Sequence, residues 1–337
     1  MKSNFIEFSI KSTTGMIKLN RPDSLNALNF DMANEFYDQL LRWKQDETIK
    51  QILLFGHGKG LCAGGDVKSL FLSSNKNNLK KEFFKIEYRL NNAINEFTKP
   101  HLSIWDGIVM GGGIGLSIYG NMRLATEKTK FAMPETAIGF FPDVGGSYFL
   151  SRLQKGIGLY IGLTGKACNA RDLMDLGLAT HYFPSNELSP TIEKYIEEEN
   201  LNQSNYYPEM SSEITENKSF IEDTFIGNID KIMNILKNTS IEFGKQLYHH
   251  LLTRCPMSLV VTAKLIEKAK NKSLQKCLEM EYQLCQHMVY RNDFNNGVDA
   301  ILVSKNHKPK WHPKSLKDIN MDEVEKLFKF HTENILI

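Results

Sequence analysis

The sequence predicts an α/β fold, in which a largely parallel sheet with crossover helices is followed by a mainly helical C-terminal region. Two observations lead to this prediction. Short apolar runs alternate with helical patterns as far as about residue 182, and such alternation is typical of crossover units on a parallel sheet. Residues 184–228 are then rich in Glu, Asn and Ser, and the remainder is helical in pattern with few strand signals. We therefore expect a core at 1–183 and a helical region at 184–337 that packs on it.

The first elements are expected to be a hairpin and an amphipathic helix. Alternating runs at 5–10 and 16–19 flank Thr13-Thr14-Gly15, which is typical of a hairpin. The sequence NRPD at 20–23 then predicts a turn. Apolar residues recur with helical spacing between positions 33 and 41, so we expect a helix over 29–44 that lies on a sheet.

Later elements follow from the same two periodicities. Residues 52–55 form a continuous apolar run, which indicates a buried strand, and 102–105 and 122–125 resemble it. Helical patterns cover 79–97 and 113–119. Near the C-terminus, Ser273 can cap a further helix. The buried stripe expected on that helix is Leu274, Cys277, Leu278, Tyr282, Cys285 and Met288.

Composition places the chain among ordinary globular proteins and excludes several classes. It has 337 residues, is 42% hydrophobic and carries a net charge of +2, which provides no broad field for a nucleic-acid partner. Five scattered cysteines without a C-x-x-C pair indicate a reducing compartment rather than disulfides or structural zinc. The first twelve residues lack signal-peptide and transit-peptide character, and no apolar stretch reaches the roughly 20 residues of a membrane span. We expect a cytoplasmic protein without membrane contact.

Glycine is concentrated in two loops, each directly after a predicted buried strand: GHGKGLCAGG at 56–65 and GIVMGGGIG at 107–115. The phosphate-binding pattern G-x-x-x-x-G-K-[ST] does not occur in the sequence. The dinucleotide pattern G-x-G-x-x-G fails at Leu61 and Leu116, and the nucleophile-elbow pattern G-x-S-x-G fails at Tyr119. Two loop amides that point at one oxygen would form a site for acyl chemistry. The alternative is that these glycines only permit turns and close packing.

Two carboxylates are candidates for proton transfer. Glu135 and Asp143 lie among apolar residues, each beside a proline, and apolar surroundings raise a carboxyl pKa toward the useful range. Alternatively, Asp143 could cap a helix and Glu135 could lie in the first turn of one. The helical pattern alone predicts that Glu87 lies on a solvated face. Histidines are dispersed without metal-ligand spacing, so no metal is expected.

Four short motifs follow one another along the chain: LNRP at 19–22, LNAL at 25–28, CAGGD at 62–66, and DG at 106–107 leading into GGG at 111–113. In this order and spacing they resemble the crotonase, or enoyl-CoA hydratase/isomerase, superfamily of acyl-CoA enzymes. More narrowly, residues 123–150 and the terminal positions Asp293-Phe294 and Pro309-Lys310-Trp311 resemble the 3-hydroxyisobutyryl-CoA hydrolase branch. The resemblance covers essentially the whole chain.

The resemblance implies a crotonase-like spiral of ββα turns with a helical C-terminal region. It also implies hydrolysis of a short β-hydroxyacyl-CoA thioester, most simply 3-hydroxyisobutyryl-CoA in valine catabolism. By position, the amides of Gly65 and Gly112 would hold the thioester carbonyl oxygen. Glu135 and Asp143 match the catalytic carboxylates of the branch, and they contact substrate together with Gly112. Glu87 matches a substrate-binding glutamate, which replaces the expectation of a solvated side chain.

Coenzyme A is expected along the loops of Asn26, Ala27 and Ala63, with several basic residues nearby as open candidates for its phosphates. CoA is part of the substrate, so no cofactor is expected, and a homo-oligomer is left open. Gly115 stands where hydratases of the superfamily carry a catalytic glutamate, which disfavours hydration. The alternatives are another crotonase activity, hydration or isomerisation, and a noncatalytic acyl-CoA-binding protein.

Overall fold

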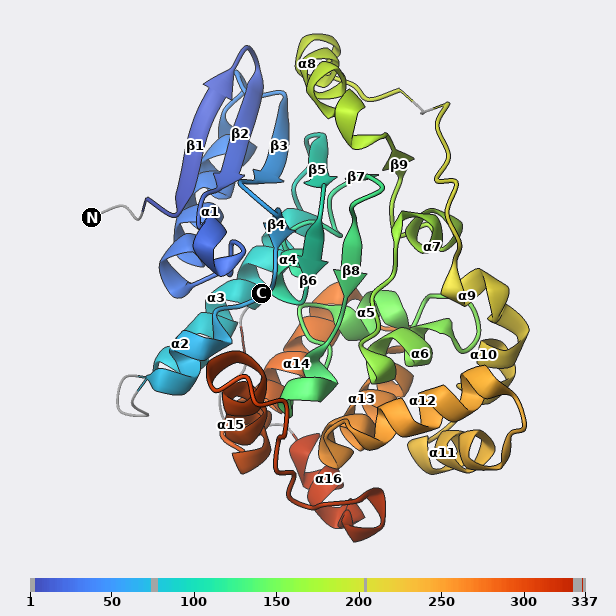
Figure 1. Ribbon diagram of the computed structural model, residues 1–337. Helices are drawn as coiled ribbons and strands as arrows, with labels where there is room; N and C mark the ends of the chain where they lie inside the picture. Colours follow the sequence, from blue (N-terminus) through green and yellow to red (C-terminus); the bar gives the residue numbers. More distant parts are fainter. Residues whose placement is uncertain (1–3, 74–77, 203–204, 330–334, 336–337) are drawn as a thin grey trace. The chain divides into compact units, whose positions relative to one another are not determined.

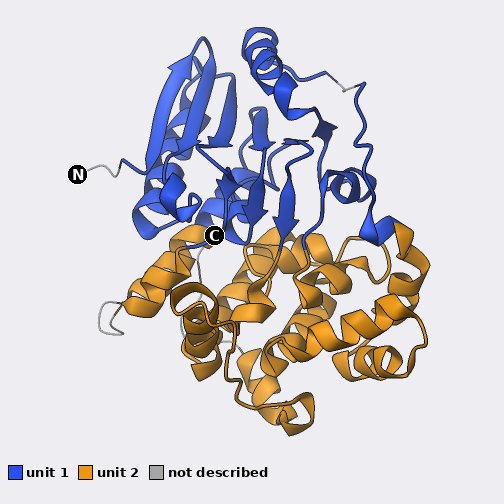
Figure 2. Ribbon diagram, viewed as in Figure 1, with its two compact units in different colours: residues 1–65, 89–132, 167–215 blue, residues 66–88, 133–166, 216–337 orange. Residues whose placement is uncertain are grey.

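The computed structural model describes residues 4–73, 78–202, 205–329 and 335, and its contacts divide the chain into two compact units (Figures 1 and 2). Unit 1 comprises Met1–Gly65, Arg89–Ala132 and Ala167–Thr215, and unit 2 comprises Asp66–Tyr88, Met133–Lys166 and Glu216–Ile337. These units cut across the predicted ranges 1–183 and 184–337, because two segments of the N-terminal half share their contacts with the C-terminal helices. The second predicted range also includes residues 203–204, 330–334 and 336–337, which lie outside the described residues.

Unit 1 is built on a six-stranded sheet in the order β1-β2-β3-β5-β7-β9. Its first two strands pair antiparallel as the predicted hairpin, and all later neighbours pair parallel, so the expected largely parallel sheet is confirmed. The strands are β1 (Ile6–Lys11), β2 (Thr14–Leu19), β3 (Gln51–Gly56), β5 (His101–Trp105), β7 (Met122–Ala125) and β9 (His181–Tyr182).

A second, three-stranded parallel sheet was not predicted. Its strands, in spatial order, are β4 (Gly60–Cys62), β6 (Ile108–Met110) and β8 (Lys130–Ala132). Each has only three residues, two of them lie within the glycine-rich segments, and such short runs give no period-2 signal. Each follows a strand of the larger sheet directly, as β3-β4, β5-β6 and β7-β8. This repeated pairing of strands, with a helix before the next pair, is the predicted spiral of ββα turns.

Helices cover the larger sheet of unit 1. The predicted helix at 29–44 is α1 (Phe30–Gln45), whose N-cap Asn29 accepts a bond from the Met32 amide at 2.9 Å. α8 (Leu188–Glu198) contributes Tyr195 to a buried cluster with Leu53 and Leu102 of the sheet. Burying one such side chain contributes about 1.5–3 kcal/mol. The sheet is therefore buried by helices from both ends of the unit's sequence.

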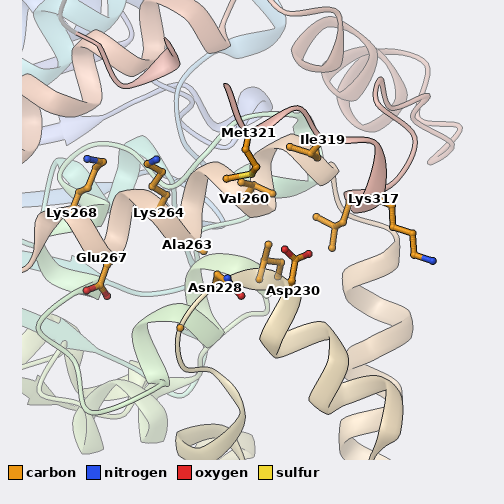
Figure 3. A pocket seen from close by; sticks show the side chains of 13 residues that line it. Asn228, Asp230, Val260, Ala263, Lys264, Glu267, Lys268, Lys317, Ile319 and Met321 are labelled. Atoms are coloured by element: carbon orange, nitrogen blue, oxygen red, sulfur yellow. The ribbon is translucent and has the colours of Figure 1, made fainter. Parts of the chain in front are cut away.

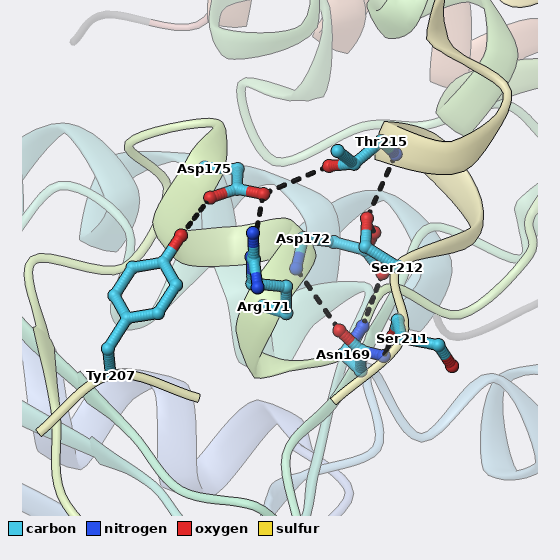
Figure 4. Close-up of polar contacts among 8 residues, drawn as sticks. All are labelled: Asn169, Arg171, Asp172, Asp175, Tyr207, Ser211, Ser212 and Thr215. Atoms are coloured by element: carbon cyan, nitrogen blue, oxygen red, sulfur yellow. Dashed lines mark hydrogen bonds and ion pairs between the residues drawn. The ribbon is translucent and has the colours of Figure 1, made fainter. Parts of the chain in front are cut away.

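Hydrogen bonds from α7 (Ala170–Asp175) fix the irregular segment before residue 215 (Figure 4). The Asp175 carboxylate accepts bonds from Arg171 at 3.0 Å, from the Thr215 hydroxyl at 2.9 Å and from the Tyr207 hydroxyl. Asp172 completes a capping box and also accepts a bond from the Ser212 hydroxyl. The polar composition of this part of the chain therefore supplies its attachment to α7.

Unit 2 contains helices without a strand among its described residues, as the C-terminal pattern predicted. The predicted helix after Ser273 is α14 (Leu274–Met288), and the Ser273 side chain accepts a bond from the Lys276 amide at 3.3 Å. All six predicted stripe residues are buried. The other helices of this unit are α2 (Val67–Leu72), α5 (Gly146–Leu150), α6 (Ile157–Thr164), α10 (Lys218–Thr224), α11 (Ile229–Asn238), α12 (Glu242–Leu252), α13 (Pro256–Ala269), α15 (Asn292–Val298) and α16 (Met321–Leu327).

The remaining elements are short or span the boundary between the units. α3 (Leu79–Asn95) and α9 (Glu213–Glu216) span it, and α4 (Gly112–Gly115) is much shorter than the predicted helix at 113–119. Four 3₁₀ helices and one π-helix complete the described structure. They are η1 (Pro22–Ser24), η3 (Glu135–Ile138), η4 (Ser185–Glu187), η6 (Leu316–Asp318) and the π-helix η5 (Asp299–Val303).

Candidate active site

Three carboxyl side chains cluster within unit 2: Glu87, Glu135 and Asp143. Their residues are only 2%, 6% and 5% exposed. Glu87 lies on α3, Glu135 begins η3, and Asp143 lies in the loop before α5. They are close enough that the charges of Asp143 and Glu135 both act on Glu87. The structure therefore brings together the three acidic residues selected from the sequence.

The helical pattern of α3 gave the wrong environment for Glu87. The face of α3 that carries Phe84, Glu87 and Tyr88 is buried. Phe84 stacks on Phe140 with ring centroids 5.4 Å apart, and Phe140 stacks in turn on Phe141 at 4.4 Å. These rings provide apolar surroundings that disfavour charge. Glu87 is therefore buried beside Glu135 and Asp143 and is not solvated.

Burial dominates the electrostatics of this cluster. It is the main reason why the pKa values of Glu87 and Glu135 are well above the ordinary range, with the Asp143 charge as the next cause for each. Burial also raises the pKa of Asp143 to about 7, although the hydrogen bond from Tyr88 lowers it in part. Carboxyls that hold protons near neutral pH suit general acid and base roles.

Two oxygen atoms of this cluster have no hydrogen-bond partner among the described residues: Oε1 of Glu87 and Oε2 of Glu135. An unsatisfied buried polar group costs about 1–3 kcal/mol. Such groups in native structures often mark a place where a ligand or water supplies the missing bond. The free oxygens therefore distinguish these two side chains from glutamates that only support the fold.

Asp143 is not a helix cap, contrary to the alternative considered from the sequence. α5 begins at Gly146, and its N-cap Gly145 has no side-chain cap bond. Asp143 instead accepts a hydrogen bond from the buried Tyr88 hydroxyl at 2.8 Å. The N-terminal amides of α5 are bound by Glu281 of α14. Glu135, by comparison, does lie in the first turn of η3, as that alternative proposed.

Tyr88 and Glu281 were not predicted from the sequence. A signal for Glu281 was present, since position 281 has helical spacing to the buried positions 277, 278 and 285 of the predicted stripe. A glutamate on an apolar stripe needs partners inside the protein. Tyr88 follows Phe84 by four residues on the buried face of α3, but the pattern could not show its partner, which lies 55 positions away.

The two glycine loops lie against each other within unit 1. A Cβ atom on Gly113 would lie 2.4 Å from the Cys62 carbonyl oxygen, and one on Gly64 would lie 3.7 Å from the Gly112 nitrogen. Gly64 has φ +117°, which favours glycine. Within the described part of the chain, the N–H groups of Gly65 and Gly112 donate to no acceptor. The two predicted oxyanion donors therefore come from adjoining loops and are unused by the fold.

The residues expected near CoA support the first of these loops. The buried Asn26 side chain accepts a bond from the Arg21 amide at 2.8 Å. It donates to the His57 and Gly60 carbonyls at 2.9 and 3.0 Å. Ala63 donates its N–H to the Leu25 carbonyl at 3.0 Å, and the Ala27 carbonyl accepts a bond from the Arg21 guanidinium. These bonds fix the loop shape, and a role of these residues in CoA binding stays a prediction.

A cavity of about 670 Å³ in unit 2 contains none of the predicted site residues (Figure 3). Its wall combines apolar side chains such as Val260 and Met321 with Lys264 and Lys268.

Among the described residues, no group of three or more His, Cys, Asp or Glu side chains is arranged to hold a metal ion. No described helix has both the length and the apolar character needed to cross a bilayer.

Comparison with solved structures confirms the predicted fold. A carnitinyl-CoA dehydratase from Mycobacterium thermoresistibile superimposes with a TM-score of 0.92 at 32% identity and covers 99% of both chains. An enoyl-CoA hydratase from Rhodobacter sphaeroides gives a TM-score of 0.91 at 27% identity, covering 96% of this chain and 97% of the other.

Sequence comparison identifies curated relatives over nearly the full chain. A mitochondrial 3-hydroxyisobutyryl-CoA hydrolase from Xenopus laevis is 40% identical over 93% of this chain and 86% of its own length. The protein of the same name from Homo sapiens is 39% identical over 95% and 87%. Their names include a mitochondrial location, so the predicted cytoplasmic location has no support from them. A model of the enoyl-CoA hydratase/isomerase family matches residues 14–328. The chain therefore belongs to the enoyl-CoA hydratase/isomerase family.

Proposed function

We propose that this chain hydrolyses the thioester of 3-hydroxyisobutyryl-CoA to 3-hydroxyisobutyrate and CoA, a reaction of valine catabolism. The observation that carries the proposal is the buried cluster of Glu87, Glu135 and Asp143, in which Glu135 keeps one carboxyl oxygen without a partner among the described residues. Relatives that share about 40% of the sequence bear the name of this hydrolase. The family and the carboxyl cluster thus point to the same chemistry.

The reaction requires a stabilised oxyanion and an activated oxygen nucleophile. In the proposed mechanism, the thioester carbonyl oxygen accepts bonds from the Gly65 and Gly112 amides, and these bonds strengthen as negative charge develops on that oxygen. Removing one donor of this kind typically costs about 10²–10³ in rate. Both amides are free of acceptors in the described chain, which this role requires.

Glu135 provides the nucleophile by one of two routes. Both routes start from the ionised carboxylate, so Glu135 must first release to solvent the proton that its raised pKa favours. The carboxylate then either removes a proton from water, whose oxygen attacks the acyl carbon, or attacks that carbon itself to form an anhydride that water opens. In both routes the carbon–sulfur bond breaks and the thiolate takes up a proton. Single turnover in ¹⁸O-water separates the routes, because label in the Glu135 carboxyl requires the anhydride.

In the proposed mechanism, Asp143 and Glu87 contact the substrate. Asp143, with its pKa raised to about 7 by burial, binds the β-hydroxyl group or protonates the departing thiolate. Glu87 has a free buried oxygen that can accept a bond from a substrate donor. A buried polar group that loses its substrate partner is left unpaired, which gives strong discrimination against analogues lacking a hydroxyl. The β-hydroxyl is therefore the expected determinant of specificity.

A thiol-release assay tests the proposal. The panel is 3-hydroxyisobutyryl-CoA, 3-hydroxypropionyl-CoA, isobutyryl-CoA and crotonyl-CoA. We expect rapid release from the first two and release from isobutyryl-CoA at least about 10²-fold slower. Loss of crotonyl-CoA absorbance without thiol release would identify a hydratase instead. Binding of all four without turnover would identify a noncatalytic acyl-CoA-binding protein.

Substitution of Glu135 tests the site itself. Glu135→Gln should lower kcat by about 10³-fold or more, because the amide can neither attack the acyl carbon nor accept a proton. Glu279→Gln is the matched control, since the Glu279 carboxylate binds Lys276 and Gln275 of its own helix. Normal hydrolysis by Glu135→Gln would remove Glu135 from the mechanism.

A further inference from the structure

The loop that carries Asp143 has an unfavourable backbone conformation. Val144 has φ +53° and Gly145 has φ +77°, so two successive residues are left-handed. For a β-branched residue such as valine this conformation is a genuine outlier and is energetically unfavourable. Such a conformation persists only where the surroundings determine it strongly. Something must therefore hold the loop in this shape.

Glu281 provides that support from α14. Its carboxylate is fully buried and accepts bonds from the Gly145 amide at 2.6 Å, the Ser147 amide at 3.0 Å and the Ser147 hydroxyl. These donors lie directly after Val144, so the carboxylate fixes the C-terminal side of the left-handed pair. Burial raises the pKa of Glu281 to about 8, so at neutral pH these bonds go mainly to the neutral carboxyl. Three donors on adjacent residues nevertheless restrict the loop to this conformation.

The same helix supports the other side of the loop. Asp143 accepts its bond from Tyr88, and the Tyr88 ring packs edge-on against Tyr282 with centroids 6.3 Å apart. Tyr282 follows Glu281 directly in α14. α14 thus contacts both the amides after Val144 and the tyrosine that binds Asp143.

We propose that Glu281 is a positioning residue, which holds the 143–147 loop in its left-handed conformation and so keeps the Asp143 carboxyl beside Tyr88, Glu87 and Glu135. Glu281 does not touch the reacting atoms and acts only through Asp143. The inference rests on the proposed function in one respect, because activity reports the position of Asp143 only if Asp143 serves the hydrolysis. A structural measurement is therefore needed as well.

Glu281→Gln is the informative substitution because it is nearly isosteric. Its amide oxygen can still accept the Ser147 donors, whereas its NH₂ group faces the Gly145 N–H, so one strong bond becomes a repulsive contact. The loop then relaxes away from the left-handed pair. A displacement of about 1 Å at a catalytic group can cost 10²-fold in rate. We expect kcat/KM for 3-hydroxyisobutyryl-CoA to fall by about 10–10²-fold.

A double-mutant cycle separates positioning from a general structural role. The variants are Glu281→Gln, Asp143→Asn and the double variant, with Glu279→Gln on the same helix as matched control. If Glu281 acts through Asp143, the double variant should be no slower than Asp143→Asn alone. The Glu279→Gln control should keep wild-type kinetics. Multiplicative losses in the double variant would overturn the proposal, since they would mean that Glu281 acts independently of Asp143.

A carboxyl ¹³C NMR titration provides the readout that does not depend on activity. The Asp143 signal, assigned by its loss in Asp143→Asn, should titrate near pH 7 in the wild type, because burial raises the pKa of Asp143 to about 7. In Glu281→Gln the midpoint should move toward the ordinary aspartate range as the carboxyl leaves its buried position. An unchanged midpoint would overturn the proposal whether or not the wild type hydrolyses any thioester. A wild type inactive on the whole panel, with the midpoint shifted as expected, would defeat the proposed function alone.

Ser147→Ala provides a second variant if Glu281→Gln does not fold. It removes one of the three donors to Glu281 and leaves both amides in place. We expect a smaller loss of about 3–10-fold in kcat/KM, which should disappear in the Asp143→Asn background. An equal loss in both backgrounds would contradict the positioning role.

Discussion

Tyr88 sets how readily Asp143 gives up its proton. Its hydroxyl donates to the Asp143 carboxylate at 2.8 Å inside the buried cluster. A donor stabilises the charged form and therefore lowers the pKa of the carboxyl. Burial acts in the opposite direction and prevails, which leaves the pKa of Asp143 raised to about 7. The Tyr88 hydroxyl, 55 positions away in the sequence, thus opposes in part the effect of burial on the pKa of Asp143.

Tyr88→Phe should therefore raise the pKa of Asp143 further, because only the lowering contribution is removed. A hydrogen bond to a charged group is worth about 1.5–3 kcal/mol, which corresponds to roughly one pKa unit or more. The pH profile of kcat/KM should show the limb assigned to Asp143 displaced to higher pH by about this amount. Tyr290→Phe, at a residue that is 45% exposed, should leave the profile unchanged. A limb that stays in place would show that Tyr88 has no control over this proton.

At the scale of single elements, α14 combines a predictable part with an unpredictable one. Its N-cap Ser273 and its buried stripe follow from spacing and capping alone, and both are confirmed. Its role in holding the 143–147 loop depends on contacts between positions about 135 residues apart. Local sequence patterns therefore predict the cap and the buried stripe of α14, but they cannot predict its contacts with the 143–147 loop.

Loss of the α14 cap should destabilise the protein without altering the chemistry. Ser273→Ala removes the acceptor for the Lys276 amide, and such losses typically cost about 1 kcal/mol. The free energy of unfolding, measured by urea denaturation, should fall by about this amount, while kcat stays within twofold. Ser273→Asp restores an acceptor at the cap and should restore stability. Equal stability of all three proteins would mean that the cap contributes nothing.

The short α4 shows why the sequence predicts some elements poorly. The helical pattern at 113–119 led us to expect a longer helix, whereas the structure has only Gly112–Gly115. The triple glycine serves close approach of two loops, a requirement that has no periodicity. The three-residue strands β4, β6 and β8 were likewise not predicted, because such short runs show no period-2 pattern. The family resemblance, by contrast, selected Gly65 and Gly112 in these loops. Their amides have no acceptor among the described residues.

Gly113→Ala should separate the two glycine loops. The added Cβ would lie 2.4 Å from the Cys62 carbonyl oxygen, and backbone cannot give way as a side-chain tip can. We expect a loss of stability of about 1–3 kcal/mol from overpacking and a loss of kcat of about 10²-fold from displaced amides. Gly162→Ala in α6 is the matched control, because its Cβ would meet only side-chain atoms. Calorimetry and the thiol-release assay should therefore distinguish these two buried helical glycines.

For the whole molecule, the predicted groups divide between the two units. The glycine amides belong to unit 1 and the carboxyl cluster belongs to unit 2. The chain enters unit 2 at Asp66, directly after Gly65, and returns to unit 1 directly after Tyr88. The predicted division at residue 183 missed this interleaving, because composition changes along the sequence while packing groups segments that are distant in it. The family motifs select residues from both units, since a motif match does not depend on where domains are divided.

The buried carboxyls should make the stability of the whole protein depend on pH. The pKa of Asp143 is about 7 in the folded state, against an ordinary value of 3.8 for the same side chain in water. A carboxyl whose pKa is raised by folding stabilises the folded state while protonated. That contribution is fully present below the unfolded pKa and is lost as pH rises through the folded value. Asp143 alone should therefore weaken the folded state progressively between about pH 4 and pH 7.

Asp143→Asn removes this dependence because asparagine stays neutral. Relative to the wild type, the variant should gain stability as pH rises from 4 to 7, by at most about 1.4 kcal/mol per pH unit, and the gain should level off above pH 7. Urea denaturation of both proteins at pH 4, 5, 6, 7 and 8 measures the difference. Asp223→Asn is the control for the chemical change itself, since the Asp223 side chain is 79% exposed. If the free energies of unfolding of wild type and Asp143→Asn differ by the same amount at every pH, the fold does not hold the Asp143 carboxyl neutral. A difference that widens as pH rises would show that burial of this carboxyl lowers the stability of the folded protein once the group must ionise.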